Sequence, residues 1–179
     1  MAPLDLRSMA IRIGAAVIVG AVVGLERERK HRPAGFRTMI LISLGSCGFV
    51  LTGMEAIAAY AGDVQSRPPG FPAIGQSEIS RVLQGLIGGV GFLGAGAVLQ
   101  NKKAVRGLTT AAAVWIVAAM GAACGLGFFK LALMLGAASL FTLLVLEVVE
   151  ERYFPEPRHW HAEHQDPARA DNPPGPQIH

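Results

Sequence analysis

The stretch that decides the fold covers residues 24–38 and reads GLERERKHRPAGFRT. It holds five Lys or Arg residues and two Glu residues between two strongly apolar runs. A Lys or Arg at the centre of a membrane costs about 2.5–3.5 kcal/mol on insertion scales, so this charge is expected to stay outside the hydrocarbon layer. Loops rich in Lys and Arg remain on the cytoplasmic side of a membrane. If the flanking runs are membrane spans, this loop is cytoplasmic and orients the rest of the chain.

The composition also favours a membrane protein. Of the 179 residues, 51% are hydrophobic and only 16% are charged, whereas a soluble domain carries about 25% charged residues. The length is that of one domain. The net charge of +3 comes mostly from residues beside apolar runs, so we expect no nucleic-acid binding. Cys47 and Cys124 have neither a CxxC partner nor a His at metal spacing, and we expect them to be small buried hydrophobes rather than a disulfide, zinc or redox site.

Five apolar runs predict an all-α integral membrane protein with five transmembrane helices, because about 20 apolar residues cross a bilayer. The first run ends without the small-residue cleavage site of a signal peptide, so we expect the chain to retain it as a span. The expected spans are residues 9–25, 39–61, 79–99, 108–127 and 131–149.

Lys and Arg concentrate in two turns on the same side of this arrangement. The second basic turn covers residues 100–107 and reads QNKKAVRG. The positive-inside rule therefore places both basic turns and the C-terminus in the cytoplasm and the N-terminus outside. We expect residues 1–152 to form the membrane domain and residues 153–179, rich in Pro and His, to form a disordered cytoplasmic tail.

Glycine is unusually frequent in the third run, where six glycines fall within twelve residues. In water each would cost a helix about 1 kcal/mol relative to alanine, but in a bilayer glycine lets helices approach closely. We therefore expect this helix at the centre of the bundle, and the alternative is a locally broken helix that lines a cavity. The expected helix-packing residues, with two GxxxG pairs among them, are Gly20, Gly24, Gly85, Gly88, Gly89, Gly91, Gly94, Gly96, Gly121 and Gly125.

Few ionisable residues interrupt the spans. Arg12 lies near the start of the first span, where we expect its side chain to extend to the nearer surface. Glu55 is expected at the outer interface, although an ionisable residue within a span is by default a functional candidate. Arg81 and Gln84 are further candidate polar residues on the outer side.

We expect no catalytic, cofactor-binding or metal-binding site in the spans. They contain no Ser–His pair, HExxH motif or paired carboxylates, so the chain is not expected to be an enzyme. Magnesium seeks oxygen ligands, but Glu55 and Glu147 lie near span ends, which argues against a magnesium pathway unless oligomers combine backbone carbonyls. Metal binding by His159, His161 and His164 in the His-rich tail is an alternative.

The two basic turns resemble each other. Residues 33–38 read PAGFRT and residues 105–112 read VRGLTTAA, and each precedes an apolar run. Such an echo indicates a parallel repeat of spans one–two and three–four, related by a pseudo-two-fold axis along the membrane normal. Thr38 and either Thr109 or Thr110 then fall where a helix N-cap is needed.

This echo also predicts a polar cluster at the cytoplasmic face. Arg37 and Arg106 would meet the positive ends of two helices, a combination that suits an anion or a carboxylate such as Glu26 or Glu28. The alternative is ordinary capping, with arginines that face lipid phosphates. The candidate cluster comprises Glu26, Arg27, Glu28, Arg37, Thr38, Arg106, Thr109 and Thr110.

Several motifs occur in the order found in one family of membrane proteins. They are GLERE at residues 24–28, RPAGFRT at 32–38, Arg81 with Gln84, GVGFLGAGA at 89–97, and VRGLTTAA at 105–112 followed by Trp115. Together they make residues 9–150 resemble the MgtC/SapB family. Longer members of that family add a soluble ACT-like domain after the last span, whereas about 29 residues follow here, so the short form is the better comparison.

The resemblance implies a multi-pass protein of the bacterial inner membrane. The family carries a provisional magnesium-transporter label, yet its members are thought to act as regulators in virulence and survival at low magnesium. Some are reported to restrain the F-type ATP synthase. The resemblance therefore implies a non-catalytic regulator that binds membrane protein partners, and self-association into a homo-oligomer is a further expectation. The alternative is a small transporter or ion pathway for Mg²⁺ or another ion.

Overall fold

The computed structural model describes residues 4–61, 76–101 and 104–153 of the chain. It divides into two compact units, Met1–Leu140 and Phe141–His179. The predicted tail, with the candidate metal ligands His159, His161 and His164, lies outside the described residues except for Tyr153 at its start.

The prediction of an all-α membrane protein is confirmed. The described part of the chain contains five helices, one at each predicted span, and four of them are long and apolar enough to cross a bilayer. The fifth helix continues from the first unit into the second, and its described apolar stretch is Phe129–Val145. The elements are α1 (Leu6–Arg29), α2 (Phe36–Ala61), α3 (Gln76–Gly96), β1 (Leu99–Asn101), β2 (Ala104–Arg106), α4 (Leu108–Leu126) and α5 (Phe129–Tyr153).

A short β-hairpin joins α3 to α4 where the sequence predicts only a basic turn. Strands β1 and β2 pair antiparallel, with Leu99 opposite Arg106 and Asn101 opposite Ala104. Strands of three residues are too short to show the alternating pattern by which strands are recognised in a sequence. The hairpin was therefore not predicted.

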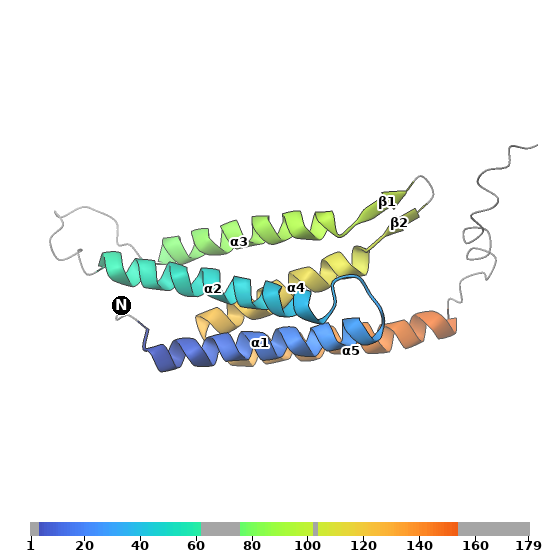
Figure 1. The fold of residues 1–179 in the computed structure, drawn as a ribbon, viewed down its shortest axis with the longest axis horizontal. Helices are drawn as coiled ribbons and strands as arrows, with labels where there is room; N and C mark the ends of the chain where they lie inside the picture. Colours follow the sequence, from blue (N-terminus) through green and yellow to red (C-terminus); the bar gives the residue numbers. More distant parts are fainter. Residues whose placement is uncertain (1–3, 62–75, 102–103, 154–179) are drawn as a thin grey trace, which may run out of the picture. The chain divides into compact units, whose positions relative to one another are not determined.

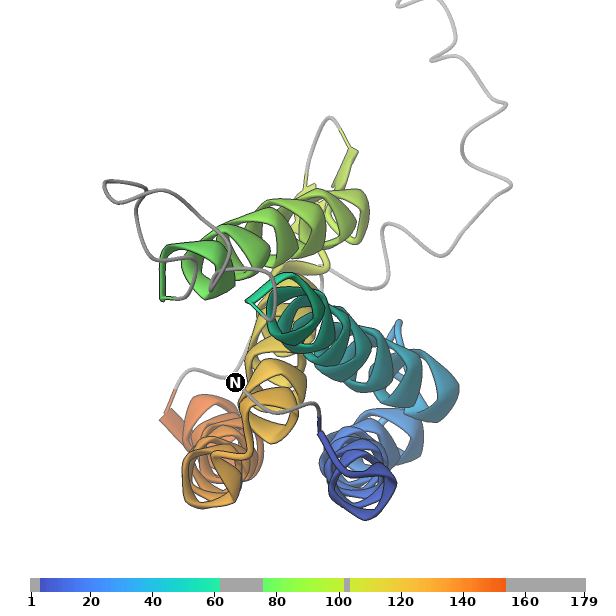
Figure 2. The same cartoon turned by 90° about the vertical axis from the view of Figure 1, so that its left-hand side faces the viewer.

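Helices α1 to α4 run up and down within the first unit (Figure 1). Seen from the end, α2 and α4 lie between α1 and α3 (Figure 2). Both outer helices contact both central helices. Exchanging α1–α2 with α3–α4 preserves this set of contacts, so the arrangement is compatible with the predicted parallel repeat.

Helix α1 packs on α2 through backbone contacts at two glycines. A Cβ atom at Gly20 would lie 2.8 Å from the Met39 carbonyl oxygen, and one at Gly24 would lie 2.9 Å from the Phe36 carbonyl oxygen. A larger residue would therefore push the two helices apart. The Ser43 hydroxyl of α2 donates a hydrogen bond of 2.8 Å to the Ala16 carbonyl oxygen of α1, which adds a polar contact to the same interface.

Helix α4 packs on α2 in the same way through the second glycine pair. A Cβ atom at Gly121 would overlap the Ser43 carbonyl oxygen, and one at Gly125 would lie 2.9 Å from the Cys47 carbonyl oxygen. Cys47 and Cys124 are free and buried in a shared core cluster, as expected of small hydrophobes. The backbone of α2 is thus in close contact with a glycine pair of α1 and a glycine pair of α4.

The expectation that the glycine-rich third helix lies at the centre of the bundle is wrong. Only 11% of the residues in the α3 span are buried, against 61% in α4. Among the described residues, no atom lies within 4 Å of a Cβ built on Gly85, Gly88, Gly89 or Gly96. Glycine density indicates that a helix can be approached closely, but it does not indicate whether the approaching helix belongs to the same chain.

The alternative of a broken third helix is also not observed. Helix α3 is continuous from Gln76 to Gly96. Two of its glycines, Gly91 and Gly94, face the indole ring of Trp115 on α4, with their Cβ positions 3.9 and 3.4 Å from ring carbons. Helix α3 therefore contacts α4 across an aromatic side chain rather than backbone to backbone.

We predict that Gly121→Ala destabilises the protein, because the new methyl group would overlap the Ser43 carbonyl oxygen. Overpacking of this kind costs about 1–3 kcal/mol. Gly48→Ala is the matched control, since no described atom lies within 4 Å of its Cβ position. Thermal unfolding in detergent should give a lower midpoint for Gly121→Ala only. Equal midpoints for the two variants would contradict the close contact between α2 and α4.

Candidate functional site

The loop between α1 and α2 is held by the carboxylate of Glu28. Its Oε2 atom accepts a hydrogen bond of 3.0 Å from the Phe36 backbone N–H, at the first residue of α2. A side chain at Gly35 would overlap this carboxylate. His31 and Ala34 adopt positive φ angles of 50° and 56° in the loop, which let the chain reverse in few residues. Glu28 therefore supplies the cap of α2.

The prediction that Thr38 is the N-cap of α2 is wrong. The helix begins at Phe36, so Thr38 is its third residue, and its side chain is exposed. The cap comes from a residue eight positions before the start of the helix, whereas capping motifs in a sequence place the capping side chain beside the helix start.

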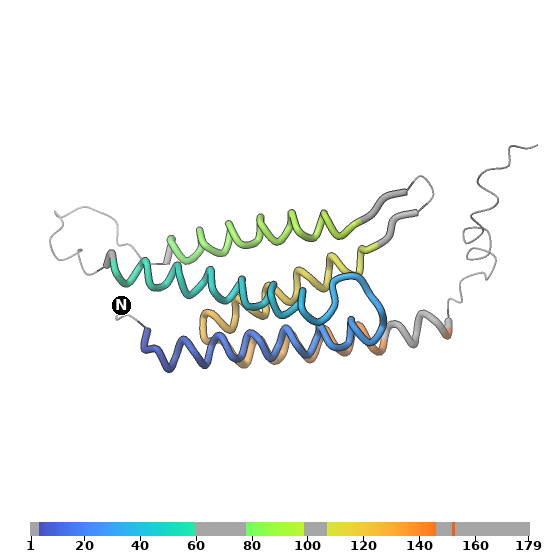
Figure 3. Tube along the Cα trace, viewed as in Figure 1, coloured from blue at the N-terminus to red at the C-terminus, as the bar shows by residue number. Residues whose placement is uncertain are grey.

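Arg27 is the buried arginine of the predicted cluster. Its side chain, in the last turn of α1, is 2% exposed. Its Nη2 atom donates hydrogen bonds to Thr110 Oγ1 at 2.6 Å and to the Pro33 carbonyl oxygen at 3.4 Å. A cation in the last turn of a helix also interacts favourably with the helix dipole. Arg27 thus connects α1 with the start of α4 and with the loop, which lie at the same end of the first unit (Figure 3).

The hypothesis that Glu26 pairs with Arg37 is wrong. Arg37 is exposed at the start of α2. Glu26 instead forms an ion pair with Lys30, one helical turn later, with 3.1 Å between Oε1 and Nζ. Residues four apart lie on the same face of a helix, so this local pair competes successfully with the long-range one. In the described part of the chain, Glu26 Oε2 and Arg27 Nε are buried without a hydrogen-bond partner.

The start of α4 differs from the prediction as well. Gly107, with a φ angle of 92°, occupies the N-cap position, and a side chain there would overlap the Ala97 carbonyl oxygen. Neither Thr109 nor Thr110 is therefore the N-cap. Thr109 is exposed, and Thr110 is buried and accepts the hydrogen bond from Arg27. Arg106 contributes its backbone to β2, and its side chain lies outside the described residues.

The structure sharpens the echo between the two halves. Helices α2 and α4 each begin directly after a glycine, Gly35 and Gly107, and each carries a threonine as its third residue, Thr38 and Thr110. Thr110 is buried against Arg27, while Thr38 is exposed. The repeat is therefore similar in backbone register and different in the contacts that its side chains make.

At the opposite end of the bundle, Arg12 binds the end of α4. Its Nη1 atom donates a hydrogen bond of 2.6 Å to the Gly125 carbonyl oxygen and lies 3.6 Å from Met54 Sδ. The expectation that Arg12 extends to the membrane surface is wrong, because the side chain is half-buried between helices. Carbonyls at a helix C-terminus lack partners within the helix and attract a cation. The sequence contains no local signal for this contact, which joins residues 113 positions apart.

The remaining polar candidates lie at the same end as Arg12. Glu55 Oε1 accepts a hydrogen bond of 2.7 Å from the Leu4 backbone N–H, just before α1. Arg81 Nη1 lies 3.8 Å from Oε1 of Glu78, one turn earlier on α3, and both side chains are exposed. Gln84 is exposed as well. Within the described residues, no group of three or more His, Cys, Asp or Glu side chains is placed to hold a metal ion.

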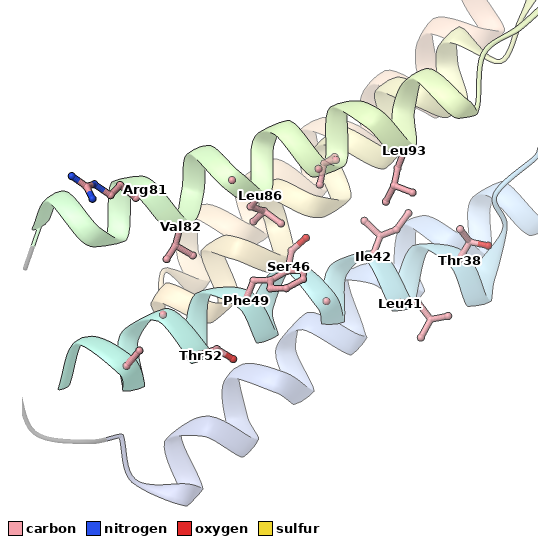
Figure 4. A pocket seen from close by; sticks show the side chains of 16 residues that line it. Thr38, Leu41, Ile42, Ser46, Phe49, Thr52, Arg81, Val82, Leu86 and Leu93 are labelled. Carbon is pink, nitrogen blue, oxygen red and sulfur yellow. The ribbon is translucent and has the colours of Figure 1, made fainter. Parts of the chain in front are cut away.

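A groove between α2 and α3 was not predicted. It has a volume of about 850 Å³ and is lined by nine residues of α2, from Thr38 to Ala56, and seven of α3, from Arg81 to Leu93. Ile42 and Ser46 of α2 and Leu86 of α3 point into it (Figure 4). Two of the helix-packing glycines that the sequence singles out, Gly85 and Gly89, form part of this lining, but no pattern in the sequence pairs α2 with α3.

We predict that Arg27→Ala lowers the free energy of unfolding by about 1.5–3 kcal/mol, the usual value of a hydrogen bond to a charged group. Arg29→Ala, at an exposed position two residues away, is the control and should change it by no more than about 0.5 kcal/mol. Unfolding in detergent measures both. In a Thr110→Val background the effect of Arg27→Ala should be markedly smaller, because residues in contact are energetically coupled. Equal effects in both backgrounds would contradict the Arg27–Thr110 contact.

Comparison with known proteins agrees with the motifs in the sequence. Residues 13–152 match the MgtC family. The chain is similar to SrpB of Synechococcus elongatus, with 43% identity over 150 residues that cover 79% of this chain and 75% of SrpB. It is also similar to SapB of Bacillus subtilis, with 38% identity over 138 residues that cover 76% of this chain and 54% of SapB.

A third relative is YhiD of Escherichia coli K12, whose name proposes magnesium transport. It is 37% identical over 144 residues, which cover 80% of this chain and 61% of YhiD. The chain thus spans little more than half the length of SapB and of YhiD. No solved structure matches the chain. Because the family match reaches from α1 into the last turn of α5, and these relatives match it over most of its length, the chain belongs to the MgtC family.

Proposed function

We propose that this protein is a non-catalytic regulator of the bacterial inner membrane that acts by binding other membrane proteins when magnesium is limiting. The observation that carries the proposal is the contrast between two sets of glycines. Gly20, Gly24, Gly121 and Gly125 contact the backbone of α2 within the chain, whereas four glycines of α3 meet no described atom within 4 Å of a Cβ position.

In a bilayer this contrast has a specific meaning. Lipid tails are as apolar as leucine, so transmembrane helices associate through close van der Waals contacts at small residues. The bundle satisfies its own packing with the glycine pairs of α1 and α4. The open glycines of α3 are then available to a helix from another molecule, which is what a regulator that binds membrane proteins requires.

The link to magnesium and to membrane energetics comes from the family. The name of YhiD proposes magnesium transport, and the resemblance of the motifs implies regulators that act at low magnesium. The F-type ATP synthase, which some family members are reported to restrain, is the first partner to test. Because this chain covers 61% of YhiD and 54% of SapB, any activity of those whole proteins is likewise part of the proposal.

A second candidate function is an ion pathway for Mg²⁺, which the name of YhiD favours. Magnesium binds through carboxylate and other oxygen ligands. In the described part of the chain, the carboxylates of Glu26, Glu28 and Glu55 are near helix ends and engaged by Lys30 and by two backbone N–H groups. This arrangement uses them to hold helix ends, and it favours the regulator over the ion pathway.

We predict that the purified full chain in liposomes moves no Mg²⁺ above the level of empty vesicles, because the carboxylates of Glu26, Glu28 and Glu55 are engaged at helix ends. A magnesium-sensitive dye inside the vesicles measures the uptake. Gly121→Ala, which is expected to loosen the bundle, controls for uptake through partly unfolded protein. Selective and saturable uptake by the native chain would replace the regulator with the ion pathway.

We also predict that affinity capture from native membranes after growth at low magnesium retrieves subunits of the ATP synthase or of an ion transporter. A second capture controls for association in detergent. In it, solubilised membranes that contain the tagged chain are mixed with separately solubilised membranes that contain the partner. A retrieved set that is the same in both preparations would count against a partner bound in the membrane.

A further inference from the structure

The groove between α2 and α3 crosses most of the height of a bilayer. Its lining on α2 runs from Thr38 to Ala56, and eighteen steps of an α-helix cover about 27 Å. The hydrocarbon core of a bilayer is about 30 Å thick. An occupant that fills the groove must therefore extend through both leaflets.

The middle of the groove is lined by small residues from both helices. Gly45 and Ser46 of α2 and Gly85 and Gly89 of α3 are among the lining residues. Among the described residues, no atom lies within 4 Å of a Cβ built on any of these three glycines. Space at the level of the backbone, rather than between long side chains, is what a second helix needs in order to approach closely.

The rims of the groove are apolar, and its ends are polar. Phe49 on α2 and Leu93 on α3 are 64% and 55% exposed, so they present large apolar surfaces beside the small-residue floor. At one end lies the hydroxyl of Thr38, and at the other the side chain of Arg81, which is 74% exposed and only 3.8 Å from Glu78. An exposed ion pair of that length is weak, so Arg81 is free to engage a carboxylate of a partner.

We propose that this groove binds one transmembrane helix of another membrane protein. Small residues of that helix pack against Gly85 and Gly89, and an acidic residue at its end faces Arg81. The inference rests on the proposed function and specifies it, since it assigns the face of the regulator and the chemistry of the partner helix.

Two other occupants fit less well. The acyl chains of a phospholipid extend through one leaflet, about half of the hydrocarbon thickness, and would leave half of the groove unfilled. A second copy of the chain in a closed dimer would place the same surface against itself, and two concave surfaces are not complementary. A helix that crosses the whole bilayer matches the length of the groove, reaches its small-residue floor and can pair with Arg81 at its end.

A pair of glycines one residue apart gives a matched test. Gly89 lines the groove and Gly88 does not, because successive residues of a helix differ by about 100° in direction. Both have open space at the Cβ position, so Gly89→Leu and Gly88→Leu can fold alike. Only Gly89→Leu fills the groove. Thermal midpoints in detergent should confirm that the two variants are equally folded.

Photo-crosslinking in the membranes of cells that express the full chain identifies the molecule that occupies the groove. The probe is p-benzoyl-phenylalanine, placed at Phe49 in the groove or at Leu133 on α5, which is 71% exposed and outside the groove. We expect a discrete adduct from Phe49 and none from Leu133. Its partner peptide should map to a transmembrane helix with a carboxylate near one end. Gly89→Leu should weaken the adduct at least tenfold, while Gly88→Leu leaves it unchanged.

Other outcomes would overturn the proposal. Adducts with lipid mass only would assign the groove to lipid, and adducts that contain only this chain would assign it to a second copy. An adduct insensitive to Gly89→Leu would show a partner bound elsewhere. Arg81→Gln should weaken the adduct up to about fivefold, the effect of losing one exposed ion pair. If partners co-purify but Phe49 gives no adduct, the regulator function stands and the groove is not the binding site. If neither partners nor an adduct are found, both the function and the binding site are wrong.

Discussion

The structure depends on how closely α1 and α4 approach the backbone of α2. Gly20 and Gly24 of α1, and Gly121 and Gly125 of α4, each have α2 backbone atoms within 3 Å of the position of a Cβ. In lipid no hydrophobic force holds helices together, so such contacts and the hydrogen bonds that they permit provide the association. Helices α1 and α4 also contact each other, and the hydrogen bonds of Arg27 and Arg12 connect them at opposite ends of the bundle.

The charged residues of the spans serve the ends of helices. Glu28 accepts the first N–H of α2, Arg12 donates to a carbonyl in the last turn of α4, and Glu55 accepts an N–H just before α1. These are the backbone groups that a helix leaves without partners, and in or near a bilayer they are costly to leave unpaired. The first span thus supplies side chains to both neighbouring helices, at opposite ends of the bundle. The sequence suggests that these charged residues orient the protein in the membrane. In the structure they also hold the bundle together.

The number and position of the helices could be predicted because long apolar runs have only one stable form in a bilayer. The GxxxG pairs of α1 and α4 could be recognised for the same reason. Which arginine of the basic stretch is buried could not be predicted, since burial depends on which residues of other helices lie beside it. The rotation of α1 against α4 places Arg27 beside Thr110, and that rotation is a tertiary property. The caps were mistaken because Glu28 reaches α2 across a loop, where local rules favour a threonine.

The error about α3 is the most informative, because it separates two uses of glycine that look the same in a sequence. In the first half of the repeat, glycines of α1 meet the backbone of α2 directly. In the second half, the indole of Trp115 lies between α4 and the glycines Gly91 and Gly94 of α3. The Cβ position of Gly94 also lies 3.8 Å from the Ala111 Cβ atom, so the α4 groups that meet these two glycines are side chains rather than backbone. The two halves of the repeat therefore pack through different contacts, and the glycines of α3 that meet no described atom, Gly85 and Gly89 among them, lie in the half that carries Trp115.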